Sequence, residues 1–454
     1  MFTGLKNQYE LTDPFLSNML SPDHELVKLK KILDWKGFNK IYFECYPSRL
    51  GRKTKATDLT IGLLLLKHYY NQSWERLVKG VHENIAIMYF CSVSFLQVIE
   101  LQKTGKWLIN PSTMVRIMKR LGAERIRRME RLFQTQLRKA GVINGETLII
   151  DTTSLEKNIA YPTEVHLLGR VIECAERVIQ KVRKKADLTK SAVLRKAKRI
   201  ARVFYSASKK TKDLLRRTSQ KLLEIANEQI VKAQTEYKRS ASAVRSRLKK
   251  AEADLSTIGK QIVSQIEQKL KGKTPKDRII SFHEPHARAL PKGKVHKPCE
   301  FGTKLRIDMS GNGYVTNYEN YLGNPNDSTM TRDAVNAHSE AYKETFRKIT
   351  ADRGFADKQA EVEMESDYDI DVIIPGKQDT KESMSVKERK VYDSRAAVEA
   401  KISEGKRCTG LSKCNYHGFE GDKICASLGI FALNARKLIR DLIEHPKIIL
   451  GFGM

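Results

Sequence analysis

The first part of the chain has hydrophobic residues at the three- and four-residue spacing of α-helices. The segment KATDLTIGLLLLKHYYNQSWERLVKGVHEN is the clearest example. A further helix is expected in NPSTMVRIMKRLG, with Ser112 as its N-cap and Gly122 at its end, because these residue types favour helix termini. We therefore expect a helical domain over residues 1–122. Several short helices with a basic last one suit a helix-turn-helix DNA-binding domain, and a plain helical bundle has the same pattern.

The pattern then changes to one more helix followed by a short apolar run. ERIRRMERLFQTQLRKAGV has helical spacing, and GETLIIDTT reads as a buried strand that leads to Asp151. A strand that ends there would deliver a carboxylate at its C-terminal end. Residues 123–164 are expected to form a connecting helix and the first strand of the next domain.

Residues 165–275 form a long and strongly basic segment with helical spacing. They contain 29 Lys and Arg against 10 Asp and Glu, and there is no proline from Thr163 to Thr274. This pattern predicts a long, coiled-coil-like helical arm, for example an antiparallel hairpin. Clustered Lys and Arg release counterions from DNA, which favours a DNA-clamping arm over a solvated coiled coil without a partner.

Strand and helix patterns alternate through residues 276–454. FGTKLRIDMS and GYVTNYEN flank the turn Gly311-Asn312-Gly313, which predicts a β-hairpin. A helix in TRDAVNAHSEAYKETFRK, a strand that ends at Asp352 and a strand in DYDIDVIIPG follow. An amphipathic helix in EGDKICASLGIFALNARKLIRDL is expected to close the domain.

One helical segment, YDSRAAVEAKISEGK, carries a narrow polar stripe. At about 100° per residue, Tyr392, Arg395, Glu399 and Lys406 project within an arc of about 60°. A solvated helix face would scatter its charges more widely, although a chance i,i+4 Arg–Glu pair is the plain alternative. Gly405 weakens the last turn, so Lys406 is expected just past the helix end.

The charge of the chain points to a polyanionic partner. There are 83 Lys and Arg against 53 Asp and Glu, a formal net charge of +30, which favours nucleic acid first and an anionic membrane surface second. No apolar run is long enough for a membrane span and the N-terminus lacks a signal-peptide pattern, so a soluble, intracellular protein is expected.

The cysteines give no metal signature. Seven are scattered without a CxxC pair, and the spacing of Cys408, Cys414 and His417 fits no common zinc site. Reduced, mostly structural thiols are expected.

Three carboxylates stand out by their predicted positions. Asp151 and Asp352 are expected at strand ends, and Glu399 on a helix. Three carboxylates at one point are what a pair of magnesium ions needs, because Mg²⁺ prefers hard oxygen ligands. Two ions about 4 Å apart can activate an attacking oxygen and stabilise a leaving oxygen. Arg395 and Lys406 would add positive charge where a phosphodiester lies.

Three local motifs carry a resemblance to a known family. They are IIDTTSLEKNIAYPTE around Asp151, ITADRGFAD around Asp352, and Y-x2-R-x3-E-x6-K from Tyr392 to Lys406. In this order and spacing they resemble bacterial insertion-sequence transposases of the DDE type. The resemblance implies an α/β fold with a ribonuclease-H-like mixed-sheet core, an N-terminal helical domain and a helical insertion between the first two aspartates.

The resemblance also implies roles for single residues. Asp151, Asp352 and Glu399 would be catalytic and would bind two Mg²⁺ ions, with Mn²⁺ as a substitute. The residues expected to contact DNA are Tyr392, Arg395, Lys406, Arg353, Asn158 and Tyr161. Better-known relatives place their large insertion between the second aspartate and the glutamate, whereas here it precedes Asp352. The resemblance therefore does not imply which path the DNA takes across this protein.

Several other polar residues have plainer interpretations. Asn158, Tyr161 and Thr163 would equally serve to close a loop. His283 and His286 are expected in loop packing or a DNA contact rather than at a metal. Asp327 is expected to be a helix N-cap, and it is the chief rival among the carboxylates. The expected surface charges on a short helix are Asp357, Glu361 and Glu363.

The function expected from the resemblance is DNA transposition. A bacterial, nucleoid-associated cytoplasmic enzyme would bind double-stranded DNA at the ends of its element, cut it and join it to target DNA, as a homodimer on DNA. A non-catalytic DNA-binding protein and a ribonuclease-H-like nuclease that never joins strands are the alternatives.

Overall fold

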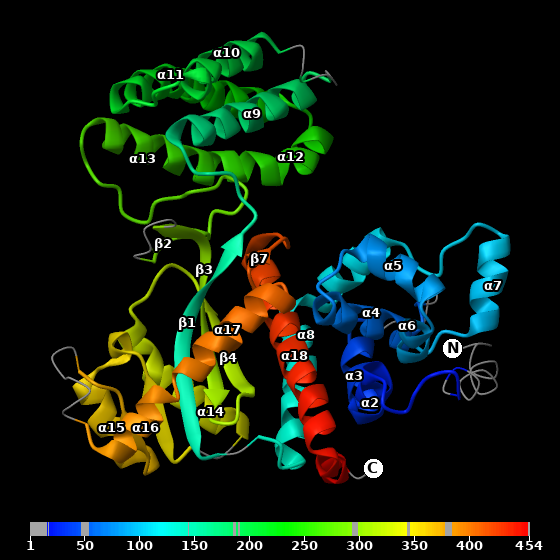
Figure 1. Cartoon of the computed structure of the whole chain (residues 1–454). Helices are drawn as coiled ribbons and strands as arrows, with labels where there is room; N and C mark the ends of the chain where they lie inside the picture. The colour runs from blue at the N-terminus through cyan, green and yellow to red at the C-terminus, as the bar shows by residue number, and fades with distance from the viewer. Residues whose placement is uncertain are drawn as a thin grey trace. The chain divides into compact units, whose positions relative to one another are not determined.

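The computed structural model describes residues 16, 18–46, 54–143, 145–184, 188, 191–292, 298–342, 346–376 and 384–452. The chain divides into two compact units (Figure 1). The first combines Met1–Glu156 with Lys304–Met454, and the second is Lys157–Thr303.

The N-terminal part of the first unit is helical, as expected. Its helices are α2 (Glu25–Ile32), α3 (Trp35–Phe43), α4 (Thr57–Tyr69), α5 (Trp74–Glu83), α6 (Ile85–Phe90), α7 (Phe95–Lys103) and α8 (Pro111–Lys139). The predicted N-cap Ser112 is wrong, because α8 begins at Pro111 after Asn110, and proline suits the first helical position. The predicted break at Gly122 is confirmed, since its φ of 71° interrupts α8.

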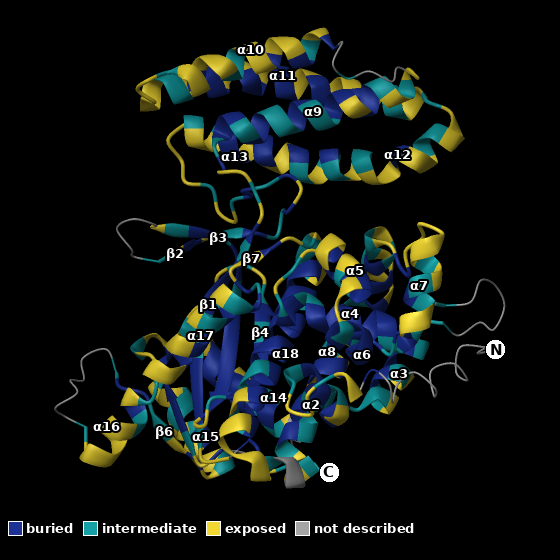
Figure 2. Cartoon of the chain, turned by 45° about the vertical axis from the view of Figure 1, so that its right-hand side comes forward, coloured by how far each residue is buried: buried dark blue, intermediate teal, exposed yellow. Residues whose placement is uncertain are grey.

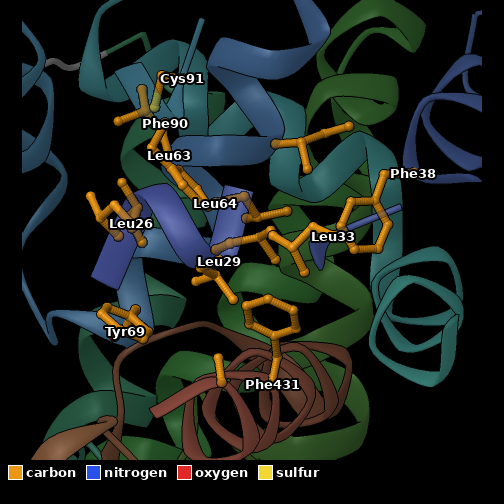
Figure 3. Packing of buried hydrophobic residues seen from close by; sticks show 14 of the residues in the cluster. Leu26, Leu29, Leu33, Phe38, Leu63, Leu64, Tyr69, Phe90, Cys91 and Phe431 are labelled. Carbon is orange, nitrogen blue, oxygen red and sulfur yellow. The ribbon is translucent and has the colours of Figure 1, made fainter. Parts of the chain in front are cut away.

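These helices share one apolar core with the long helix α18 (Gly418–Glu444). Figure 3 shows Phe431 of α18 among Leu29 and Leu33 from the N-terminal segment. The rings of Phe133 and Phe431 lie with centroids 4.8 Å apart. The helical N-terminal part is therefore not a separate bundle, because its hydrophobic faces close on the C-terminal helix.

A mixed β-sheet forms the rest of the first unit. Its strands are β1 (Thr147–Lys157), β3 (Cys299–Ser310), β4 (Val315–Tyr321), β5 (Lys348–Ala351) and β6 (Asp371–Ile373). The lateral order is β4-β3-β1-β5-β6. The predicted hairpin β3–β4 is antiparallel, and β1, β5 and β6 are parallel. The short β7 (Lys413–Cys414) also pairs with β1.

Helices cover both faces of this sheet. Ile149, Leu305 and Ile307 point to one face, where they pack with α18 and with α17 (Ala396–Cys408). Leu148 and Ile150 point to the other face and pack with α14 (Met330–Tyr342) and α15 (Lys358–Tyr368). This alternation is the two-residue period of a strand. Figure 2 shows the strands as the buried layer between helices, so the predicted α/β class is confirmed.

A buried ion pair fixes β3 to its neighbours. Arg306 and Asp308 are joined by two hydrogen bonds of 2.9 and 3.0 Å, and both side chains are almost fully buried. The guanidinium also donates to the Tyr321 hydroxyl and the Met330 carbonyl. A bidentate pair with its other groups satisfied is the arrangement in which a buried charge is tolerated.

The second unit contains helices α9 (Glu164–Val182), α10 (Ala192–Ser206), α11 (Lys212–Arg239), α12 (Ser242–Asp254) and α13 (Lys260–Leu270). A π-helical turn at Leu255–Gly259 links α12 to α13. The helices enclose their own apolar core, so the predicted helical insertion is present. It is a bundle rather than one hairpin, because apolar residues on every helix pack together. Strand β2 (Arg288–Pro291) pairs with the start of β3.

Among the described residues, no helix combines the length and the apolar character that crossing a bilayer requires.

Glu130 of α8 provides a test of this packing. Its side chain is buried, with 2% of the residue exposed, and burial raises its pKa from 4.5 to about 8, against the lowering effect of nearby Arg127. The folded protein thus holds this proton between about pH 4.5 and 8, where the unfolded chain releases it. Stability should fall as the pH rises through this window.

We therefore predict that Glu130→Gln raises the free energy of unfolding at pH 8 by about 1–2 kcal/mol, with little change at pH 4. Urea denaturation at both pH values measures this. Glu124→Gln, on the exposed side of the same helix, is the matched control. Equal effects of Glu130→Gln at pH 4 and pH 8 would contradict the prediction.

Candidate active site

The parallel pairing of β1 with β5 brings two aspartates together. Ile150 on β1 is the register partner of Ala351 on β5, so Asp151 and Asp352 follow side by side on strands about 4.8 Å apart. Asp352 directly follows its strand, as predicted. The prediction that the first strand ends at Asp151 is wrong, because β1 continues to Lys157.

Asp151 lies in an environment that disfavours its charged form. Its pKa is raised to about 6, chiefly by burial, and the nearby charges of Asp352 and Glu399 contribute in the same direction. The Thr152 N–H, which donates to Asp151 Oδ1 at 2.7 Å, and the Arg395 guanidinium have the opposite effect. All three predicted carboxylates therefore interact electrostatically at one place.

Arg395 lies at the centre of this cluster. Its Nη1 donates to Glu399 Oε1 at 2.9 Å and is 3.8 Å from Asp352 Oδ1. On its other side the guanidinium lies 5.4 Å from the centroid of the Tyr392 ring. Tyr392 is buried, with 5% of the residue exposed. Its ring therefore packs against the guanidinium on the protein side and does not face solvent.

The prediction of one continuous helix across the polar stripe is wrong. Tyr392 belongs to α16 (Val386–Asp393), and Glu399 to α17 (Ala396–Cys408). A turn at Ser394 and Arg395 separates them. The capping box of Ser385 and Glu388 sets the first residue of α16, and this determines the position of Tyr392 on the helix.

Apolar contacts hold α17 against the sheet. Val398 and Ile402 are buried in the core on that face. A Cβ on Gly405 would lie 2.9 Å from Leu411 Cδ1, so glycine here permits a close approach rather than ending the helix. Lys406 was expected past the helix end, which is wrong because α17 continues through it. It lies two turns after the glutamate, on the same side.

Asp327 is not the helix N-cap that the sequence suggested. It opens a short 3₁₀ turn, Asp327–Thr329, whose N-cap is Asn326 and whose cap makes no side-chain hydrogen bond. Its carboxylate instead accepts hydrogen bonds from Lys304 Nζ at 2.9 Å and from Thr152 Oγ1 at 3.2 Å. Because Thr152 adjoins Asp151, this fourth carboxylate belongs to the surroundings of the site.

The residues expected to hold DNA after β1 lie in the second unit. Asn158 is exposed and Tyr161 is 74% exposed, with its ring edge-on to Phe301 at 5.6 Å between centroids. Thr163 caps α9 by accepting a hydrogen bond from the His166 N–H at 3.1 Å. Their contact with DNA stays a prediction.

The remaining polar residues have local partners. Arg353 follows Asp352, and its N–H donates to that carboxylate at 2.8 Å. Asp357 caps α15 and its N–H donates to Glu361. Glu363 forms an ion pair with Arg332 on the surface. The interpretation as charges on a short helix thus holds for Glu361 and Glu363, whereas Asp357 precedes the helix as its N-cap.

No group of three or more His, Cys, Asp or Glu side chains in the described ranges is drawn closely enough together to hold a metal ion. His283 packs its ring against Phe282, and burial lowers its pKa. His286 Nδ1 lies 3.8 Å from Glu284 Oε2. Both histidines contact neighbours in their own loop, as the loop-packing interpretation expects.

Sequence reasoning missed two residues of the site, Thr152 and Lys304. The only signal for Lys304 is its position in a strand, two residues before Arg306 on the same face. A lysine at such a position is rarely buried unless it has a partner, and here its side chain is 14% exposed.

Comparisons with known proteins agree with part of the resemblance. Residues 14–120 match a family described as "Transposase domain (DUF772)". The chain is also 28% identical over 169 residues to "Uncharacterized protein ORF8 in nfe locus" of Rhizobium meliloti, which covers 37% of this chain and 78% of that protein. No solved structure matches the chain significantly. The N-terminal part of the chain is therefore similar to a transposase domain.

Proposed function

We propose that this protein is a DDE-type DNA transposase, which cuts DNA at the ends of its own element and joins the freed end to target DNA. The observation that carries the proposal is the meeting of Asp151, Asp352 and Glu399 around Arg395, in a chain whose N-terminal part matches a transposase domain. Double-stranded DNA is its partner, and two copies would act together, one at each end.

We also propose a ribonuclease-H-like core, which the sheet topology supports. The order β4-β3-β1-β5-β6 combines an antiparallel hairpin with two strands parallel to β1. The first aspartate lies on the central strand, the second follows its parallel neighbour, and the glutamate comes from a helix that covers one face. This topology brings three residues that are far apart in sequence to one place beside the central strands β1 and β5.

The chemistry of the donor set fits magnesium. Carboxylate oxygens are the ligands that Mg²⁺ prefers. In the structure the Arg395 guanidinium pairs with Asp352 and Glu399, so it supplies positive charge where a metal ion would bind. Asp151, Asp352 and Glu399 would hold the ions. When bound, the metal supplies an activated water and neutralises charge on the leaving oxygen.

The chain's own residues would orient the substrate. Arg395 presents a planar guanidinium that matches a phosphate, and the Tyr392 ring keeps it in place. Lys406 lies further along the same helix and would contact a neighbouring phosphate. The partial burial of Asp151 limits water around the reacting atoms and strengthens these interactions.

The second unit offers a basic surface for the DNA backbone. Five cations project from α10, which carries no acid: Arg195, Lys196, Lys198, Arg199 and Arg202. All five are exposed, whereas Leu194, Ala197 and Phe204 of the same helix are buried. The exposed side of α10 is visible in Figure 2. We propose that this face of α10 binds phosphates.

Cleavage of DNA carrying the element's terminal repeats tests the proposed function. With Mg²⁺, wild type should cut at the repeat ends, and Glu399→Gln should lower the rate by about 100-fold or more while DNA binding is unchanged. Glu340→Gln, an exposed acid on α14, is the control. Binding without cleavage by the wild type would instead identify a non-catalytic DNA-binding protein. Cleavage without strand transfer would identify a nuclease.

Arg395 should compete with metal in the DNA-free protein, because the guanidinium and the metal use the same carboxylates. We predict that Arg395→Gln binds Mn²⁺ about 5-fold or more tightly than wild type without DNA. DNA should tighten Mn²⁺ binding by wild type, since a phosphate draws the arginine away. Titrations followed by electron paramagnetic resonance measure both effects. Arg347→Gln, at an exposed arginine, is the control, and equal affinities of all three proteins would refute the competition.

The α10 surface should control the salt dependence of DNA binding. Replacing Lys196, Arg199 and Arg202 with glutamine should reduce the slope of log K against log salt by about 2 to 3, since each lost phosphate contact removes about 0.9. The control removes three exposed cations of α12 and α13, namely Arg247, Lys250 and Lys260. Equal slopes for the two triple variants would mean that net charge alone matters.

A further inference from the structure

Asp327 connects the segments that carry the first two aspartates. Lys304 Nζ donates to Asp327 Oδ1 at 2.9 Å and to the Pro325 carbonyl at 2.8 Å, which holds the carboxylate and its own loop together. The side chains of Lys304 and Asp327 are 14% and 30% exposed. Because both side chains are partly buried, water weakens their attraction less than it weakens a surface ion pair, and the pair holds the two segments more firmly.

Thr152 transmits this arrangement to Asp151. Its Oγ1 donates to Asp327 Oδ1 at 3.2 Å, and its backbone N–H donates to Asp151 Oδ1 at 2.7 Å. Neighbouring side chains of a strand point to opposite faces. The threonine thus bonds to one carboxylate on each face of the sheet, and fixing its side chain also fixes the N–H that orients Asp151.

The turn after β5 lies against the other oxygen of the same carboxylate. A Cβ on Gly354 would be 3.6 Å from Asp327 Oδ2, so this turn packs directly on Asp327. Thr331 Oγ1 also donates to the Phe355 carbonyl at 3.4 Å, a second link between the two segments. The turn begins at Asp352, so Asp327 and the residues after it contact both segments that carry the strand-borne aspartates.

We propose that Asp327 is a positioning residue of the active site, which with Lys304 holds Thr152 and the Asp352 turn so that the two aspartates keep their relative placement. Its role in catalysis rests on the proposed function; its structural role does not. Asp327 acts through its neighbours, since its Oδ1 accepts hydrogen bonds from Lys304 and Thr152 and its Oδ2 lies against the turn at Gly354.

Two variants in the full-length protein test this proposal. Asp327→Asn keeps the shape but removes the charge, and Thr152→Val removes the hydroxyl but keeps the backbone N–H. Each should lower kcat for cleavage of element-end DNA about 10- to 100-fold, with KM for DNA within about twofold, as for residues that orient metal ligands. The loss in the double variant should be smaller than the product of the two single losses, because Thr152 and Asp327 share one hydrogen bond.

Hydrogen exchange by mass spectrometry gives a readout that does not need activity. Peptides covering residues 148–156 and 351–356 should exchange faster in Asp327→Asn than in wild type, while Asp333→Asn, an exposed acid of α14, should leave them unchanged. Unchanged exchange in these peptides, losses that add in the double variant, or an effect on KM alone would overturn the proposal. If wild type itself does not cleave, the proposed function fails, and the exchange result still decides the positioning role.

Discussion

The site depends on the register between two short parallel strands. Pairing of Ile150 with Ala351 forces the next residues, Asp151 and Asp352, to lie side by side. Two like charges at strand spacing repel each other, and partial burial increases the cost. Two features reduce this repulsion. The pKa of Asp151 is raised, which favours its neutral form, and the positive charge of Arg395 lies beside the carboxylates. A slip of one residue would turn Asp151 to the opposite face of the sheet.

Helix α18 joins the two parts of the first unit into one structure. Its residues enter both the core of the N-terminal helices and the core on one face of the sheet. The middle of α18, from Ile424 to Ala435, is buried on all sides, whereas its last turns expose charged residues. The amphipathic pattern expected from the sequence therefore describes only its C-terminal part. The helices that match the transposase domain therefore fold against the same element that supports α17 and Glu399.

Periodicity and turn residues predict most of the elements, because these are local properties. The β3–β4 hairpin, the break at Gly122 and the helical insertion all follow from short segments. The environment of Asp327 does not follow from a short segment, because its partners, Lys304 and Thr152, come from the distant strands β3 and β1. A residue of its type before a helix reads as a cap unless the tertiary contacts are known. The separation of Tyr392 from Glu399 by a turn, and the closing of the basic arm into a bundle, likewise depend on packing that periodicity does not report.

The helical insertion leaves β1 and returns through β3, and these strands are neighbours in the sheet. Its two ends are therefore about one strand spacing apart, and it has an apolar core of its own. A module connected in this way can be gained, lost or exchanged in evolution without changing the register of the host sheet. The proposed catalytic carboxylates and the proposed phosphate-binding face of α10 would thus be encoded in separate parts of the chain, which could diverge at different rates.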